Sequence, residues 1–194
     1  CLSIFIFFQS SAMVMTYDQV HDLTKTILAG GSYNFISMEI KDSKSFCPNY
    51  ENLNSDEKED FIAHLIAQIS QYESNYNTET IFRENNGNIS TGLLQISFPS
   101  ISKRYKENGC NEIKDTKDLK NAEKNIKCGL AIMTSLIKFN GYLSNSKKAS
   151  ASSYWSTLRR PYAIYIKSIK RTVHVGKKYE IIAGLKHKYN ICFE

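Results

Sequence analysis

Residues 55–77 read SDEKEDFIAHLIAQISQYESNYN. The segment opens with Ser55, a candidate N-cap, and two acids, which favour the first turn of a helix. Its apolar residues then recur with a helical period and share one face of the predicted helix: Phe61, Ile62, Leu65, Ile66, Ile69 and Tyr72. This pattern predicts an amphipathic helix with Glu73 at its end.

Glu73 stands beside the apolar face of this predicted helix. Burial disfavours an ionised carboxylate, and the negative end of the helix dipole acts in the same direction, so both raise the pKa of the carboxyl group. A general acid for glycosidic bonds must still carry its proton near neutral pH. Glu73 is therefore a candidate catalytic acid, although a glutamate at a helix end is more commonly a surface residue.

Two motifs distinguish Glu73 from an ordinary surface glutamate. Residues 73–77 read ESNYN and residues 90–97 read STGLLQIS. They resemble the soluble lytic transglycosylases and the related goose-type lysozymes, in which Glu-Ser-x-aromatic-Asn closes the catalytic helix and Gly-Leu-Met-Gln-Ile follows. Leu94 replaces the methionine, which conserves apolar volume. A third block, DLKNAEKNIKCG at residues 118–129, resembles the start of the family's next long helix, so the similarity covers residues 55–138.

The resemblance implies a mainly α, lysozyme-like fold with a substrate groove between two lobes. A small β-hairpin is expected over residues 85–97, where turn-forming residues occur. The resemblance also implies cleavage of the β-1,4 bond between MurNAc and GlcNAc in peptidoglycan, by a lytic transglycosylase or a lysozyme-type muramidase with Glu73 as general acid. It implies no cofactor.

The similarity also suggests substrate-binding residues, namely Ser74, Ser90, Gly92, Gln95, Tyr154 and Trp155. Gly92 would allow a close backbone approach in the groove, and the amide of Gln95 would bind sugar or orient Glu73. Family members usually carry Ala-Tyr-Asn-Ala-Gly where this chain has ASSYWS at residues 151–156, so only Tyr154 is carried over. Trp155 would either stack on a sugar ring or pack in the core.

The presence or absence of a second catalytic carboxylate distinguishes two possible reactions. Ordinary glycosidases use two carboxylates, whereas lytic transglycosylases use one glutamate and the sugar's own hydroxyl, which gives a 1,6-anhydro product. Glu79 and Glu84 lie between the two motifs, and Glu84 is the candidate helper. Its alternative is a solvated acid in a turn-prone stretch. The sequence favours the single-glutamate route and leaves hydrolysis open.

Four cysteines, Cys47, Cys110, Cys128 and Cys192, are spread over residues 13–194 and indicate one or two disulfides. Three pairings are possible, and Cys192 would hold the C-terminal tail. None of the cysteines has the spacing of a zinc site, and His64 is expected on the solvated face of its helix. We therefore predict no metal site.

Residues 1–12, CLSIFIFFQSSA, resemble the end of a signal peptide, with an apolar run followed by small residues; a buried strand is the alternative. We expect a secreted or periplasmic protein in which residues 13–194 form one lysozyme-like catalytic domain with N- and C-terminal extensions. No segment approaches the roughly 18 apolar residues of a membrane span, so we expect no stable membrane insertion.

The charge is asymmetric along the chain. Residues 1–97 hold five Lys and Arg against twelve Asp and Glu, a net charge of −7, and residues 98–194 hold twenty against seven, a net charge of +13. The basic half would attract an anionic polymer. Because no nucleic-acid-binding motif is present, we expect peptidoglycan or a related anionic glycan as the partner of a monomer, and no nucleic acid. A solvated basic surface without a partner is the alternative.

Outside the matched blocks, a helix is predicted over residues 17–28 and irregular structure over residues 30–54. Ile126, Leu130, Met133 and Ile137 form a stripe that we interpret as core. The spacing of Tyr162, Ile166 and Ile169 predicts another helix, followed by mixed structure over residues 172–194.

Two other functions are compatible with these residues. The first is a non-catalytic protein that binds cell-wall glycan in the same groove. The second is a chitinase-like or chitosanase-like hydrolase, because lysozyme-type folds host several glycan specificities.

Overall fold

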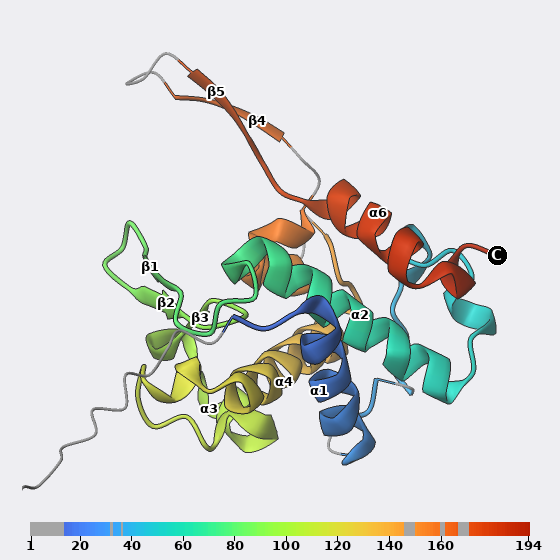
Figure 1. Cartoon of the computed structure of the whole chain (residues 1–194), viewed down its shortest axis with the longest axis horizontal. Coiled ribbons are helices and arrows are strands. Elements are labelled where there is room, and N and C mark those ends of the chain that lie inside the picture. The colour runs from blue at the N-terminus through green and yellow to red at the C-terminus, as the bar shows by residue number, and fades with distance from the viewer. Residues whose placement is uncertain (1–13, 32, 36, 146–149, 160–161, 167–170) are drawn as a thin grey trace, which may run out of the picture.

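A computed structural model describes residues 14–31, 33–35, 37–145, 150–159, 162–166 and 171–194 (Figure 1). The expected signal-peptide remnant, residues 1–12, lies outside the described residues. The fold is mainly helical and lysozyme-like, as predicted. Its helices are α1 (Tyr17–Ala29), α2 (Ser55–Ser74), α3 (Lys103–Tyr105), α4 (Ala122–Asn140), α5 (Ala151–Tyr154) and α6 (Lys178–Lys188).

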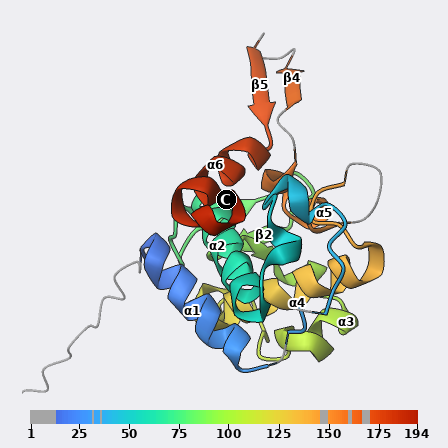
Figure 2. The same ribbon diagram turned by 90° about the vertical axis from the view of Figure 1, so that its right-hand side faces the viewer.

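Helix α2 runs through the middle of the molecule, and both α1 and α6 pack against it (Figures 1 and 2). The predicted apolar face of α2 is buried from Phe61 to Ile69, and Tyr72 at its end is partly exposed. The helix starts with a capping box, in which the side chain of Asn54 accepts from the backbone N–H of Glu57 and the Glu57 carboxylate accepts from that of Asn54. These contacts fix the direction of the helix that carries Glu73.

The ESNYN motif ends α2. Asn75 and Tyr76 both adopt left-handed backbone conformations, with φ of 51° and 61°. Asparagine tolerates this region better than most residues, which explains its place directly after the helix. The backbone N–H of Asn75 donates to the carbonyl of Gln71, so the chain turns away at once and leaves Glu73 in the last turn of the helix.

A small antiparallel sheet follows, with strands β1 (Ile81–Arg83), β2 (Ile89–Thr91) and β3 (Ile96–Ser97) in that order. It confirms the predicted hairpin but starts earlier than residue 85. Residues 84–88 form the connection between β1 and β2, because the polar Glu-Asn-Asn-Gly-Asn sequence favours a turn, and the backbone N–H of Glu84 donates to the carbonyl of Asn88.

Asn125 of α4 joins the second and third blocks of the sequence. Its buried side chain accepts from the backbone N–H of Leu94 and donates to the carbonyls of Thr91 and Leu119, at distances of 2.9, 3.1 and 2.7 Å. One amide thus satisfies three buried backbone groups and holds the loop of the STGLLQIS motif on α4. The apolar stripe of α4 is buried, as predicted.

The prediction of a helix from the spacing of Tyr162, Ile166 and Ile169 is wrong. Residues Tyr162–Ile166 and Arg171–Val175 form the antiparallel strands β4 and β5, which project from the helical body (Figures 1 and 2); Ile169 lies outside the described residues. The sequences YAIYI and RTVHV are rich in β-branched and aromatic residues, which favour strands over the helical spacing that we considered.

His64 also departs from its prediction, because its side chain is only 11% exposed. Helix α1 packs against the side of α2 that we expected to face solvent. The ring of His64 stacks on His21 of α1, with centroids 4.1 Å apart, and contacts Tyr189 beyond the end of α6. Neighbouring helices therefore cover the polar side of α2 as well as its apolar side.

Two disulfides close the fold, Cys47–Cys192 and Cys110–Cys128. The first holds the C-terminal tail, as predicted, and the second attaches the end of the turn Lys106–Cys110 to α4. None of the described helices combines the length and apolar character needed to cross a membrane.

Candidate active site

A groove of about 620 Å³ opens between the end of α2, the three-stranded sheet and residues 153–157. Glu73 lies on its α2 side and Glu84 on its sheet side. Gln95, Tyr154 and Thr157 also line it. The structure thus brings together residues from all three sequence regions in which we predicted site residues.

The carboxyl group of Glu73 is largely removed from water. Burial raises its pKa to about 7, although a hydrogen bond from Thr157 acts in the opposite direction. The Thr157 hydroxyl donates to Oε1 of Glu73 at 2.8 Å. At neutral pH Glu73 is therefore divided between its protonated and ionised forms, as a general acid requires.

Glu84 is held in the wall of the groove. The hydroxyl of Ser90 on β2 donates to Oε1 of Glu84 at 2.6 Å, and the Glu84 side chain is partly buried. A freely solvated loop acid would lack this support. Glu79, the other acid between the motifs, instead forms an ion pair with Lys120 outside the groove.

Tyr154 and Gln95 both line the groove, and both use polar atoms to hold its shape. Tyr154 Oη accepts from the backbone N–H of Ser97 at 3.2 Å. Burial, together with the nearby charges of Glu84 and Glu73, holds the pKa of Tyr154 well above its usual value. Gln95 has a left-handed backbone, and its Nε2 donates to the carbonyls of Thr80 and Gly92. Among the described atoms, Gln95 Oε1 has no hydrogen-bond partner. The amide therefore makes no hydrogen bond to Glu73 among the described atoms.

Three other residues predicted to bind sugar instead contact other parts of the protein. Ser74 is buried, and its hydroxyl donates to the carbonyl of Ser70 within α2. Gly92 does allow a close approach, but of the backbone of Leu119 and the side chain of Asn125, and not of the groove. Trp155 is 1% exposed and donates from Nε1 to the carbonyl of Leu94. It forms the floor of the groove, so its ring faces cannot stack on a sugar.

The sequence motifs indicate neither Thr157 nor the exposed apolar residues Ile81 and Phe82 at the rim of the groove. Thr157 lies 84 positions from Glu73 and belongs to none of the matched motifs, so only the fold reveals the contact. Ile81 and Phe82 on β1 line the groove and are 55% and 61% exposed. Their exposure follows from the fold, so no signal in the sequence singles them out.

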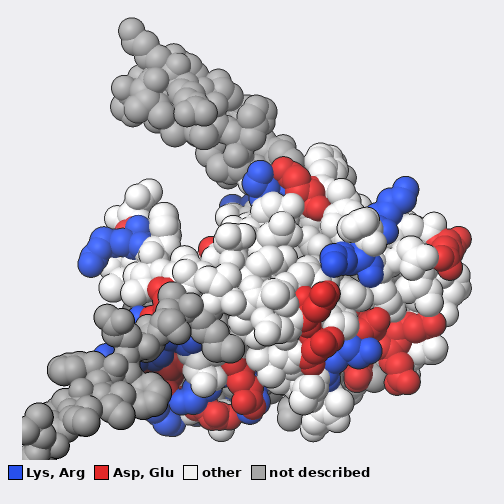
Figure 3. All heavy atoms as spheres, in the orientation of Figure 1, with Lys and Arg blue, Asp and Glu red and all other residues white. Residues whose placement is uncertain are grey.

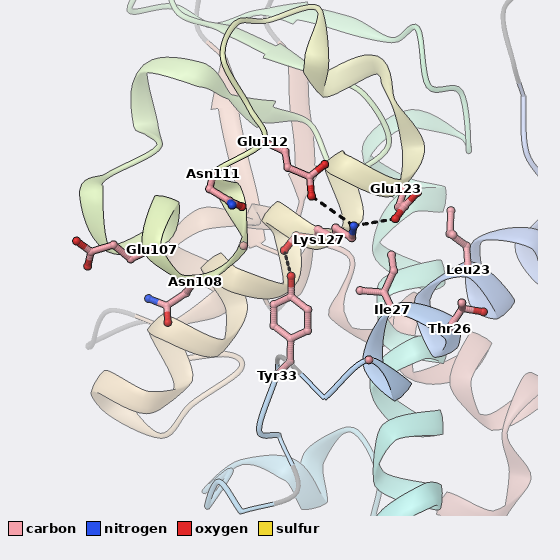
Figure 4. A pocket seen from close by; sticks show the side chains of 12 residues that line it. Leu23, Thr26, Ile27, Tyr33, Glu107, Asn108, Asn111, Glu112, Glu123 and Lys127 are labelled. Carbon is pink, nitrogen blue, oxygen red and sulfur yellow. Dashed lines mark hydrogen bonds and ion pairs between the residues drawn. The ribbon is translucent and has the colours of Figure 1, made fainter.

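A second hollow of about 650 Å³ lies between α1, the turn Lys106–Cys110 and α4 (Figure 4). Its acids are exposed, and Lys127 forms ion pairs with Glu112 and Glu123 across it, at 3.4 and 2.7 Å. A general acid for glycosidic bonds needs a carboxyl group shielded from water, which these exposed carboxylates are not. The groove that contains Glu73 is therefore the better candidate for an active site.

Charges are distributed unevenly over the surface. On the face in Figure 3, acidic side chains gather towards the lower right, where Figure 1 places α1 and the first half of α2. Basic side chains are scattered among them on this face and do not form one continuous patch.

A family model described as the transglycosylase SLT domain matches residues 52–156. This span covers more than half of the chain and includes Glu73, Glu84 and Tyr154. The chain belongs to the SLT domain family. Its function is thus of the lytic transglycosylase type and concerns peptidoglycan. SLT domains act on this polymer in the periplasm or the extracellular space, and the two disulfides are compatible with either compartment.

Solved structures support the assignment to SLT domains. The wild-type protein DslA is 25% identical, with a TM-score of 0.69 over 90% of this chain and 91% of its own. Two glutamate-to-glutamine variants of DslA, with 24% and 25% identity and TM-scores of 0.69 and 0.68, cover the same shares. No curated protein matches the sequence significantly.

Proposed function

We propose that this SLT domain cleaves the glycan strands of peptidoglycan at the β-1,4 bond between MurNAc and GlcNAc, with Glu73 as the general acid. The observation that carries the proposal is the buried carboxyl group of Glu73, with its pKa raised to about 7, at the edge of an open groove. The protonated form donates to the leaving glycosidic oxygen as the bond to the anomeric carbon breaks.

Two reactions can follow proton donation. In the first, the C6 hydroxyl of the same MurNAc attacks the anomeric carbon and returns its proton to the Glu73 carboxylate, which forms the 1,6-anhydro product. In the second, water attacks, with help from a second carboxylate. The first needs only Glu73 and is the reaction that gives lytic transglycosylases their name.

The position of Glu84 favours hydrolysis as the second candidate reaction. It lines the same groove as Glu73 and is held there by Ser90. The two DslA variants carry substitutions at glutamates eleven positions apart, which is also the spacing of Glu73 and Glu84. We propose that Glu84 assists the attack of water if the reaction is hydrolysis, and that it is not needed if the 1,6-anhydro product forms.

Mass spectrometry of peptidoglycan digests tests these proposals. We expect the unmodified chain to release muropeptides and Glu73→Gln to be at least about a thousandfold slower. Anhydro products, lighter by one water, that persist in Glu84→Gln identify the single-glutamate reaction. Reducing-end products that disappear in Glu84→Gln identify hydrolysis. Glu79→Gln, outside the groove, is the matched control and should remain active.

Other outcomes would contradict the proposal. Full activity of Glu73→Gln would exclude Glu73 as the acid. Cleavage of chitin or chitosan in place of peptidoglycan would indicate the related hydrolases. Peptidoglycan binding in a pull-down assay, with no products from any variant, would indicate a non-catalytic glycan-binding protein. We propose secretion or a periplasmic location and a monomeric state, which fractionation and light scattering would test.

A further inference from the structure

Two histidines and an aspartate meet between α1 and α2, outside the groove. Nε2 of His21 on α1 lies 3.0 Å from Oδ1 of Asp60 on α2, and Nε2 of His64 on α2 lies 3.7 Å from Oδ2 of the same carboxylate. One potential ligand atom from each residue lies within 4.8 Å of the other two. None of the three residues lines the groove that contains Glu73.

Nδ1 of each histidine ring already has a hydrogen-bond partner. Nδ1 of His21 lies 2.9 Å from Oδ1 of Asp22, and Nδ1 of His64 lies 2.7 Å from the Tyr17 hydroxyl. These contacts fix the orientation of both rings, so that each Nε2 faces Asp60. A carboxylate behind the imidazole, as Asp22 stands behind His21, supports histidines that bind metal ions. The Tyr17 hydroxyl takes the corresponding place behind His64.

Hydrogen bonding explains only part of this cluster. The contact of His21 with Asp60 is an ordinary hydrogen bond, but the 3.7 Å between His64 Nε2 and Asp60 Oδ2 is too long for one. The side chains of His21, His64 and Asp60 are 14%, 11% and 22% exposed, so water is largely kept away from them. Lys25 pairs with Oδ1 of Asp60 and leaves Oδ2 facing His64.

We propose that His21, Asp60 and His64 bind a divalent transition metal ion, with Zn²⁺ as the best fit, and that water completes its coordination. Two imidazoles and one carboxylate suit zinc and its neighbours better than Ca²⁺ or Mg²⁺, which prefer oxygen ligands. Bonds of about 2.0–2.2 Å to zinc place ligand atoms roughly 3.3 Å apart in a tetrahedron. The present spacings of 3.0 and 3.7 Å between the imidazole nitrogens and the Asp60 oxygens approach this geometry.

The ion would join two helices. Asp60 and His64 are four residues apart, so they share one face of α2, and His21 comes from α1. Three bonds to one ion would therefore clamp α1 against the helix that ends at Glu73. The metal has a structural role in this proposal, since the cluster lies apart from the groove.

Metal binding is measured on the full chain with its disulfides intact and without an affinity tag. Calorimetric titration with ZnCl₂ should show one ion per chain, and Co²⁺ should give a visible absorption band that Zn²⁺ removes. At a hundredfold excess of Zn²⁺ over the dissociation constant, the melting temperature should rise by roughly 5–10 °C. These readouts do not depend on glycan cleavage, so they can fail or succeed separately from the proposed function.

Substitutions locate the ion. His21→Gln and His64→Gln should abolish binding and the rise in melting temperature, whereas His187→Gln, at an exposed position of α6, should retain both. Circular dichroism of the metal-free variants checks their folding. If His64→Gln does not fold, His21→Gln decides the question, because His21 lies near the surface of α1. Failure of the unmodified chain to bind Zn²⁺ at micromolar concentrations, or undiminished binding in His21→Gln, overturns the proposal.

Discussion

The hydroxyl group of Thr157 donates a hydrogen bond of 2.8 Å to Oε1 of Glu73, across 84 positions of sequence. Burial raises the pKa of Glu73, while this hydrogen bond stabilises the ionised carboxylate and lowers it. The balance of the two effects sets the pH at which Glu73 can donate a proton.

Replacing Thr157 by valine should shift the pH dependence of cleavage. Valine keeps the shape of the side chain but removes the donor, so the pKa of Glu73 should rise by up to about one unit. The alkaline limb of the pH–rate profile should then move to higher pH. Thr157→Ser keeps a hydroxyl and should leave the limb near its original position. An unchanged limb in Thr157→Val would show that the hydrogen bond does not control this titration.

Glu73→Gln should stabilise the fold at alkaline pH. The pKa of Glu73 is about 7 in the folded state, against 4.5 for the unperturbed group, so the folded chain holds the proton more tightly. The resulting stability is fully present below pH 4.5 and is lost as the pH rises through 7, a loss of about 3 kcal/mol. Glutamine does not ionise. Urea unfolding at pH 5 and pH 8 should show the advantage of Glu73→Gln growing with pH, and a constant difference would contradict the raised pKa.

Gly92→Ala should be much more damaging than Gly87→Ala. Both glycines have left-handed backbones, with φ of 80° and 87°. A Cβ at residue 92 would overlap the carbonyl of Leu119 and the amide of Asn125, whereas a Cβ at residue 87 would meet nothing within 4 Å. We expect unfolding free energies lower by about 3 kcal/mol or more at residue 92 and about 1 kcal/mol at residue 87, measured by chemical denaturation. Equal losses would mean that only backbone conformation matters.

The two disulfides should differ in their contributions to stability. Cys47–Cys192 joins residues 145 positions apart, and Cys110–Cys128 joins residues 18 positions apart. A longer closed loop restricts the unfolded chain more, so paired Cys→Ser substitutions should cost about 5 kcal/mol for the first and about 3 kcal/mol for the second. Thermal unfolding of both double variants measures this. A greater loss from the shorter loop would indicate strain or residual structure in the unfolded chain.

Much of the helical framework could be predicted from the sequence. The first-turn acids and the apolar period of residues 55–73 specify α2 locally, although its N-cap is Asn54 and not Ser55, and the stripe from Ile126 to Ile137 specifies α4 in the same way. The β4–β5 hairpin could not be recognised from Tyr162 and Ile166, because their spacing satisfies a helical period and a strand period together. Strand propensity over the whole segment was the better guide.

The site could be predicted only where local motifs carried it. Glu73 was predicted from a motif and Glu84 from its place between two motifs, and both line the groove because these segments fold close to one another. Thr157 could not be found, because its contact with Glu73 depends on how the segment after α5 packs against α2. The burial of His64 has the same cause, since the helix that covers it begins nearly 50 residues earlier.

The β4–β5 hairpin is closed at its base by two backbone hydrogen bonds. Lys177 donates to the carbonyl of Thr157, and Lys178 donates to that of Arg159, so the chain returns to almost the same place after the excursion. The segment between Arg159 and Lys177 is thus an insertion whose two ends are held together by the rest of the fold. A change in the length or sequence of the hairpin should therefore leave the hydroxyl that adjusts the acidity of Glu73 in its place.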